Sequence, residues 1–79
     1  MKVEFVTWID SFTDSGWKSS EKSDYQTCFS IGVVSFEDEN CLTLGGSWDL
    51  DDEGNLQDTN NRITIPIRCI TERKTLDVV

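Results

Sequence analysis

The sequence contains no histidine, and histidine is the side chain that most often carries protons in catalysis near neutral pH. Its absence excludes serine–histidine and cysteine–histidine nucleophile pairs, together with metal sites built on imidazole. A carboxylate pair such as Asp10 and Asp14 would serve hydrolysis only inside a cleft that desolvates one of the two, and 79 residues leave little room for such a cleft. We therefore expect no catalytic residues, no cofactor and no enzymatic activity.

Paired cysteines and long apolar runs are also lacking. The three cysteines, Cys28, Cys41 and Cys69, are odd in number and widely spaced, which argues against a disulfide framework. No run approaches the ~18 apolar residues that a membrane span requires, and no secretory or transit signal is visible. The sequence therefore predicts a cytosolic protein whose cysteines are reduced and act as small buried hydrophobic residues.

Basic residues are scarce: seven Lys and Arg stand against fifteen Asp and Glu, for a net charge of −8. Nucleic acid and anionic lipid both require clustered cations, so we expect neither as a direct partner. The acidic surface either serves solubility alone or meets a basic surface of another protein. Because a chain this short buries only about 60% of its unfolded surface, homo-oligomerisation or a complex is expected to support the thin core.

Period-2 alternation of apolar residues predicts one all-β domain over residues 1–79. The expected strands span Val3–Ile9, Thr27–Phe36, Cys41–Trp48, Arg62–Ile67 and Ile70–Val78. In the first of them, Val6 and Trp8 make the second face apolar as well as the first. We expect this second face to be covered by the long loop that follows or by another subunit.

Three features between and within the strands favour a barrel. Residues 10–26 show no apolar period and predict a long loop, with one short irregular helix around residues 20–25 as the alternative. Gly45 and Gly46 permit sharp curvature or the close approach of another backbone. Pro66 removes a ladder donor and ends its strand. Together with the five strands, these features predict a small antiparallel SH3-like barrel whose closure removes the sheet edges.

The acidic segment Asp49–Asn60 partly matches the calcium loop D-x-[DN]-x-[DN]-G, with Gly54 at the sharp turn. Two positions depart from that pattern. Glu53 is one carbon longer than the usual fifth residue, and Asn60 cannot supply the bidentate carboxylate of the twelfth. We therefore interpret the segment as a solvated acidic turn with no metal site, and calcium binding as the alternative.

Two sets of residues are candidates for binding. A protein partner would be met by an aromatic residue of the loop and by carboxylates of the loop and the acidic turn: Trp17, Asp14, Asp49, Asp51, Asp52 and Glu53. A nucleotide would instead stack its base on Trp8 or Trp17 and place its phosphates on arginines: Arg62, Arg68 and Arg73. Anchoring of the core is the alternative role for the tryptophans.

Four short patterns carry a resemblance across nearly the whole chain. They are VTWIDS at 6–11, SGW at 15–17, SIGVV at 30–34 and IPIRCI at 65–70. The order of these patterns resembles that in small uncharacterised proteins of tailed bacteriophages and prophages. Those sequences carry W-x-D-[SA], then G-W, then a central strand pair and a terminal I-P-x-x-x-I. This chain departs from that family in its acidic turn, which is longer than expected, and in its additional cysteines.

The resemblance implies a phage accessory protein that is made in the host cell cytoplasm of a bacterium, where small proteins of this class often neutralise host factors. The leading hypothesis is therefore an inhibitor that binds a host bacterial protein, such as a component of a defence system. The alternative is an oligomeric binder that sequesters a cyclic nucleotide used in immune signalling. A third hypothesis is a structural phage component, for which Val6 and Trp8 would supply an apolar outer face.

Overall fold

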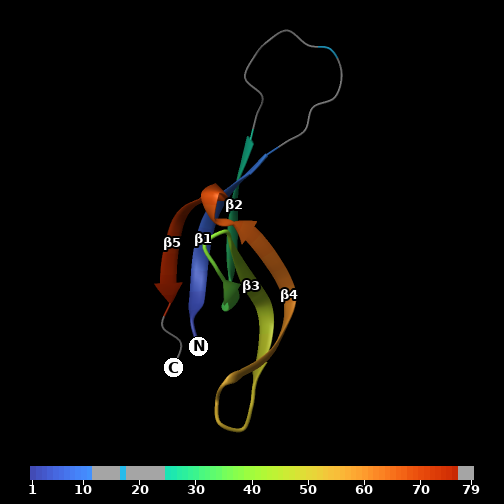
Figure 1. The fold of residues 1–79 in the computed structure, drawn as a ribbon, viewed down its shortest axis with the longest axis vertical. Helices are drawn as coiled ribbons and strands as arrows, with labels where there is room; N and C mark the ends of the chain where they lie inside the picture. Colours follow the sequence, from blue (N-terminus) through green and yellow to red (C-terminus); the bar gives the residue numbers. More distant parts are fainter. Residues whose placement is uncertain (12–16, 18–24, 77–79) are drawn as a thin grey trace.

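The computed structural model describes residues 1–11, 17 and 25–76 as five strands and one 3-10 helix. The elements are β1 Val3–Ser11, β2 Tyr25–Glu37, β3 Cys41–Leu50, β4 Leu56–Pro66, η1 Ile67–Cys69 and β5 Ile70–Leu76. Every neighbouring pair of strands is antiparallel, in the order β4-β3-β2-β1-β5 (Figure 1). The prediction of an all-β chain with five antiparallel strands is confirmed.

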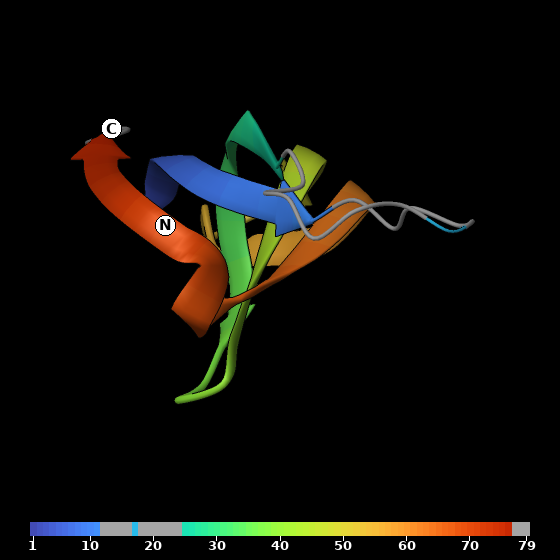
Figure 2. The same ribbon diagram turned by 90° about the horizontal axis from the view of Figure 1, so that it is seen from above.

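The sheet is open, which corrects the predicted closure into a barrel. β4 and β5 form its two edges, and no ladder joins them. Pro66 cannot donate to a ladder, and η1 turns the chain away between the two strands. The sheet is nevertheless strongly bent, so that β1 and β5 cross the direction of β3 and β4 when viewed from above (Figure 2). A register shift in β2 between Val34 and Phe36 contributes to this bend.

The main core cluster lies on the inner side of the bend, whereas Val3 and Val33, which lie opposite each other, are buried on the other side of the sheet. The main cluster consists of one residue from β1, two from β3 and one from β4: Val6, Leu42, Leu44 and Ile65. Trp8 packs against this cluster. The expectation that a loop or another subunit covers the face with Val6 and Trp8 is therefore wrong, because β3 and β4 of the same chain cover it. Burial of each such side chain stabilises the fold by about 1.5–3 kcal/mol.

Two glycines allow β2 and β3 to approach closely at the bend. A Cβ atom added at Gly32 would lie 2.5 Å from the backbone oxygen of Gly45 and 2.9 Å from its carbonyl carbon. A Cβ at Gly45 would in turn lie 2.8 Å from the Cβ of Thr59. The close backbone approach predicted at Gly45 is thus present, and its partner is Gly32.

Several element boundaries differ from the prediction. Asp10 pairs with Gln26 and Ser11 with Tyr25, so the ends of the expected loop are strand. β3 and β4 likewise extend into the expected turn and leave only residues 51–55 between them. Strand ends that face solvent need backbone hydrogen-bond partners but no apolar side chains. A prediction from the alternation of apolar residues therefore underestimates the length of these strands. Of the alternative helix around residues 20–25, only Tyr25 is described, and it begins β2; residues 20–24 and 77–79 lie outside the described residues.

The cysteines are less buried than predicted. Cys28, Cys41 and Cys69 are all half-buried, and none of them forms a disulfide. Cys69 packs against the core cluster from η1. The expectation of full burial is therefore wrong for all three.

Candidate functional site

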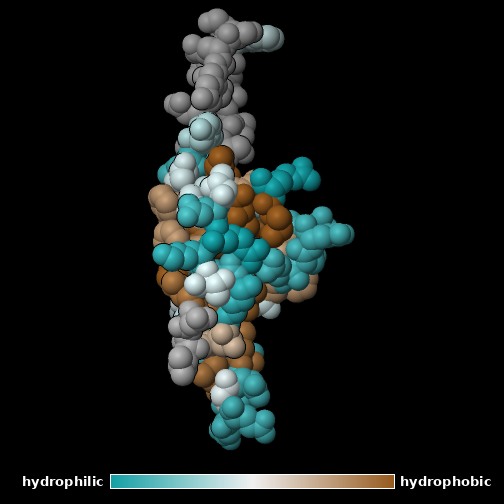
Figure 3. All heavy atoms as spheres, turned by 90° about the vertical axis from the view of Figure 1, so that its left-hand side faces the viewer, coloured by the Kyte–Doolittle hydropathy of each residue, from teal (hydrophilic) through white to brown (hydrophobic). Residues whose placement is uncertain are grey.

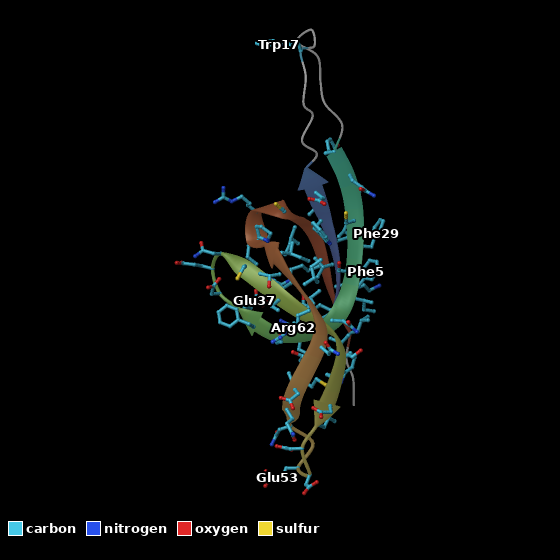
Figure 4. All side chains as sticks on the ribbon, turned by 90° about the vertical axis from the view of Figure 1, so that its right-hand side faces the viewer. Phe5, Trp17, Phe29, Glu37, Glu53 and Arg62 are labelled. Carbon is cyan, nitrogen blue, oxygen red and sulfur yellow. The ribbon has the colours of Figure 1, made fainter. Side chains whose placement is uncertain are left out.

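The outer side of the β1–β2 pair carries large apolar side chains that solvent reaches. Phe5, Phe29 and Ile31 are 38%, 65% and 57% exposed, and we call these three residues the apolar face. They share one side of the sheet because Phe5 lies opposite Ile31, Phe29 lies opposite Thr7, and alternate residues of a strand point the same way. The rings of Phe5 and Phe29 stack with centroids 6.0 Å apart and planes 27° apart, along one flank of the molecule (Figure 4).

Polar side chains border the apolar face on its β5 side. Lys74 lies opposite Phe5 and Glu72 lies opposite Thr7, so this border carries charges of both signs. A contiguous apolar patch with a polar rim is the arrangement that marks interaction surfaces, whereas single exposed apolar residues carry no such meaning. Sequence reasoning missed this face because Phe5 and Ile31 were assigned to strands without a decision on which side of the sheet is buried.

The acidic hairpin, which we define as residues 49–58 at the turn that joins β3 to β4, is held by its own carboxylates. Asp51 Oδ1 accepts the N–H groups of Glu53 and Asn55, each at 2.9 Å, and these bonds hold the pKa of Asp51 below its usual range. Asp49 Oδ1 accepts the N–H of Asp58 at 2.8 Å. Asp49 and Asp51 therefore stabilise the turn, and the exposed Asp52 and Glu53 face solvent at its tip.

The hairpin also bears on the calcium alternative. A calcium loop directs several carboxylates toward one point. In the described part of the chain, no group of three or more Cys, Asp or Glu residues could hold a metal ion. The first acidic residues of the motif instead bond the backbone of their own turn, and Gly54 provides the left-handed φ of 84° that this turn needs.

A network of charges joins β1, β2 and β5 on the inner side of the sheet. Arg73 bonds Glu4 through Nε at 2.6 Å and through Nη2 at 2.8 Å. It also bonds Glu37 through Nη1 at 2.7 Å and through Nη2 at 3.0 Å. Lys2 Nζ lies 3.0 Å from Glu4 Oε2. The Glu4 side chain is only 1% exposed, and both of its oxygens are engaged.

The network shifts the titration of its members. Hydrogen bonds from Arg73 hold the pKa of Glu4 and of Glu37 below the usual range, and this effect outweighs burial, which raises both. The same bonds, first those to Glu37 and then those to Glu4, raise the pKa of Arg73. All three groups are therefore ionised at neutral pH.

We expect the free energy of unfolding to fall as the pH is lowered below about 4.3, the ordinary pKa of a glutamate. A carboxyl whose pKa is lowered in the folded state stabilises that state fully above its unfolded pKa, and the effect is lost as the pH falls through the folded pKa. Urea unfolding from pH 7 to pH 2 measures this. Glu4→Gln should be less stable at pH 7 and show a shallower dependence, and equal slopes for both proteins would contradict the assignment.

Sequence reasoning missed Glu4, although a signal for it exists. Glu4 shares its strand face with Val6 and Trp8, so assigning that face to the core would have placed a carboxylate inside. A buried carboxylate requires a cation partner. The β1–β5 register decides which cation pairs with Glu4, because it places Arg73 opposite Val6 on the same side of the sheet.

Trp8 and Arg73, two residues of the candidate nucleotide set, have structural partners. The Trp8 ring packs against the core, and its Nε1 donates to Ser30 Oγ at 3.0 Å. Arg73 uses Nε and both terminal nitrogens on Glu4 and Glu37. The indole N–H of Trp8 and all three guanidinium nitrogens of Arg73 are thus bonded within the chain, and core anchoring is the role that the structure gives to Trp8.

The two other arginines of that set lie apart from each other. Arg62 lines a hollow of about 590 Å³ formed by residues of β2, β3 and β4, together with Phe36 and Thr64. Arg68 lines a different hollow of about 610 Å³ beside Pro66. Within the described residues neither arginine forms an ion pair. The structure therefore does not bring Trp8, Arg62, Arg68 and Arg73 to one pocket.

The candidate partner-binding residues are also divided. The exposed Trp17 and the tip residue Glu53 lie at opposite ends of the molecule (Figure 4). Asp14 lies outside the described residues. The residues at 49, 51, 52 and 53 do gather on one hairpin, and that part of the set forms a single acidic surface.

Comparisons with known proteins return no relative: no protein-family model, no curated protein and no solved structure matches the chain. Among the described residues, no helix has both the length and the apolar character needed to cross a membrane.

Proposed function

We propose that this chain is a non-enzymatic accessory protein of the bacteriophage type that binds a host bacterial protein and inhibits it. The observation that carries the proposal is the apolar face, since Phe5 and Phe29 stack across β1 and β2 and remain exposed together with Ile31, which lies opposite Phe5. Aromatic residues in such a position supply much of the binding energy at protein interfaces. The phage-like order of motifs directs the proposal to a host factor, with a component of a defence system as the target.

The acidic hairpin supports a basic character of the partner. Asp52 and Glu53 are exposed at the turn, and the chain carries a net charge of −8. Exposed carboxylates outside the centre of an interface accelerate association with a basic surface and disfavour acidic competitors. The apolar face would supply affinity, and the hairpin would supply selection among partners.

Replacing Phe29 with aspartate should weaken capture of the partner at least tenfold, which is the size of effect seen at an interface hot spot. Tagged protein is used as bait in a lysate of the bacterial host, and captured proteins are quantified by mass spectrometry. Phe36→Asp is the matched control. Phe36 is 53% exposed on the same strand, but it lines the hollow beside Arg62 and Thr64 and does not belong to the apolar face. Circular dichroism confirms that both variants are folded.

The captured protein is then purified, and its activity is measured with and without the chain. Inhibition by the unmodified protein and by Phe36→Asp, but not by Phe29→Asp, supports the proposal. Equal capture by the two variants would overturn the role of the apolar face. Tight calorimetric binding of a cyclic nucleotide, with no protein captured, would favour the sequestering alternative.

A further inference from the structure

The two edges of the open sheet differ in how well they are protected against another strand. β4 carries Asn61 with a positive φ of 53°, and it ends at Pro66, which has no N–H. Irregular backbone and proline are devices by which proteins protect an edge. β5 contains neither proline nor glycine and has no positive φ, and its register with β1 is regular from Glu72 to Leu76. β5 is therefore the edge suited to accept a strand.

The sequence of β5 is self-complementary about its middle residue. If two copies pair antiparallel with Arg73 at the centre of the pairing, the strand ITERKTL meets itself in reverse. Glu72 then lies opposite Lys74 of the second copy, and Lys74 lies opposite its Glu72. Threonines at positions 71 and 75 also meet each other. Because opposite residues share one side of a sheet with Cβ atoms about 4.5–5.5 Å apart, each symmetric pairing contains two charge pairs.

Both charge pairs would lie on the outer side of the sheet. Glu72 and Lys74 lie opposite Thr7 and Phe5 of β1, and Phe5 belongs to the exposed apolar face. Neither Glu72 nor Lys74 forms an ion pair with another described residue, so the charge of each is available to a second copy. The surface on which β5 lies is hydrophilic in its middle, with hydrophobic atoms around it (Figure 3).

Such a pairing would place Arg73 opposite Arg73 of the second copy, so that two like charges meet. The Arg73 side chain, however, points to the inner side and bonds Glu4 and Glu37, while Lys2 bonds Glu4. Two carboxylates and two cations leave this network without net charge. Inward charges commonly blunt an edge strand, and here that charge is already compensated within one chain.

We propose that two copies of this chain associate through β5 in this register and form one continuous sheet. The two-fold axis then runs perpendicular to the sheet through the Arg73 pair, and the apolar faces of both copies lie on the same side. The occupant of the β5 edge is a second copy, because the charges of the strand complement themselves. This inference does not depend on the proposed inhibition of a host protein.

Sedimentation equilibrium and native mass spectrometry test the pairing. The unmodified protein should form a concentration-dependent dimer. Glu72→Lys and Lys74→Glu should each raise the dissociation constant at least tenfold, because like charges then lie opposite each other. The double variant E72K/K74E should restore the dimer, and a mixture of the two single variants should form a heterodimer in preference to either homodimer.

The control is Asp52→Lys on the acidic hairpin, which makes the same change in net charge as Glu72→Lys. Both substitutions reduce the negative charge and so reduce general repulsion, and Glu72→Lys should weaken the dimer although Asp52→Lys does not. A wild-type protein that stays monomeric at its highest soluble concentration would overturn the proposal. So would a double variant as weak as the singles, or equal weakening by Asp52→Lys. Thermal unfolding confirms that every variant is folded.

Discussion

Replacing Arg73 with methionine is expected to lower the free energy of unfolding by about 3 kcal/mol at pH 7, because it leaves a buried carboxylate without its main partner. Glu4 is 1% exposed, and Arg73 supplies two of the three cationic contacts to its oxygens. Lys2 retains the third contact, which places the expected loss at the lower end of the range for a broken buried pair. Urea unfolding at pH 7 measures the loss.

Two further variants separate this effect from a loss of packing. Arg62→Met removes an exposed cation that forms no ion pair within the described residues, and it should change stability by no more than about 0.5 kcal/mol. Glu4→Gln combined with Arg73→Met should be less destabilised than the sum of the single changes, since no charge then remains buried. If Arg62→Met and Arg73→Met were equally destabilising, the network would have no structural role.

Replacing Gly32 with alanine should cost about 2 kcal/mol, within the range for forcing extra volume into a packed interior. The added Cβ would lie 2.5 Å from the Gly45 oxygen and 2.9 Å from its carbonyl carbon. Both are backbone atoms of the neighbouring strand, so no side chain can rotate to relieve the contact. β2 and β3 must separate at the bend, where Val33 and Leu44 contribute to the core.

Gly46→Ala is the matched control. It is also a strand glycine, but a Cβ there would lie 3.4 Å from its nearest neighbour, the backbone oxygen of Asn61. That distance requires a shift of only a few tenths of an ångström, so we expect a much smaller loss. Chemical denaturation of both variants measures the difference. Equal losses would mean that β-sheet propensity, and not the close approach of two backbones, governs these positions.

Arg73→Met and Gly32→Ala also serve as controls for the capture experiment, because they separate a loss of stability from a loss of binding. Arg73 and Gly32 support the inner side and the bend, whereas the apolar face lies on the outer side of β1 and β2. A destabilised but folded Gly32→Ala protein should therefore still capture the partner, while the stable Phe29→Asp protein should not. Stability and binding would then be shown to reside in different residues.

Alternation was sufficient to predict all five strands, yet it could not decide which side of each strand is buried. In β1 both residue sets, one with Val6 and the other with Phe5, are apolar. The set with Val6 meets Leu42 and Leu44 across the bend, whereas in the other set Val3 is buried and Phe5 stays exposed. Those contacts join positions more than thirty residues apart. The exposed apolar face was therefore missed, and Val6 and Trp8 were wrongly expected to need an outside cover.

The roles of charged residues depended still more on tertiary contacts. Arg73 has the chemistry of a phosphate ligand, and the sequence assigned it to a candidate nucleotide set. The β1–β5 register instead places it beside Glu4, and the bend of β2 brings Glu37 to its other side. The hairpin was easier to predict, because Asp51 and Gly54 act within four residues of each other along the chain.

By itself the sequence determined the strand-forming segments, the glycine and proline positions that bend or end them, and the acidic turn. Each of these depends on neighbours along the chain, whose geometry local chemistry dictates. Only the tertiary structure decided that the sheet stays open, which apolar set is buried and which cation neutralises Glu4. Those outcomes depend on register and curvature, which bring distant segments together through packing that no local pattern encodes.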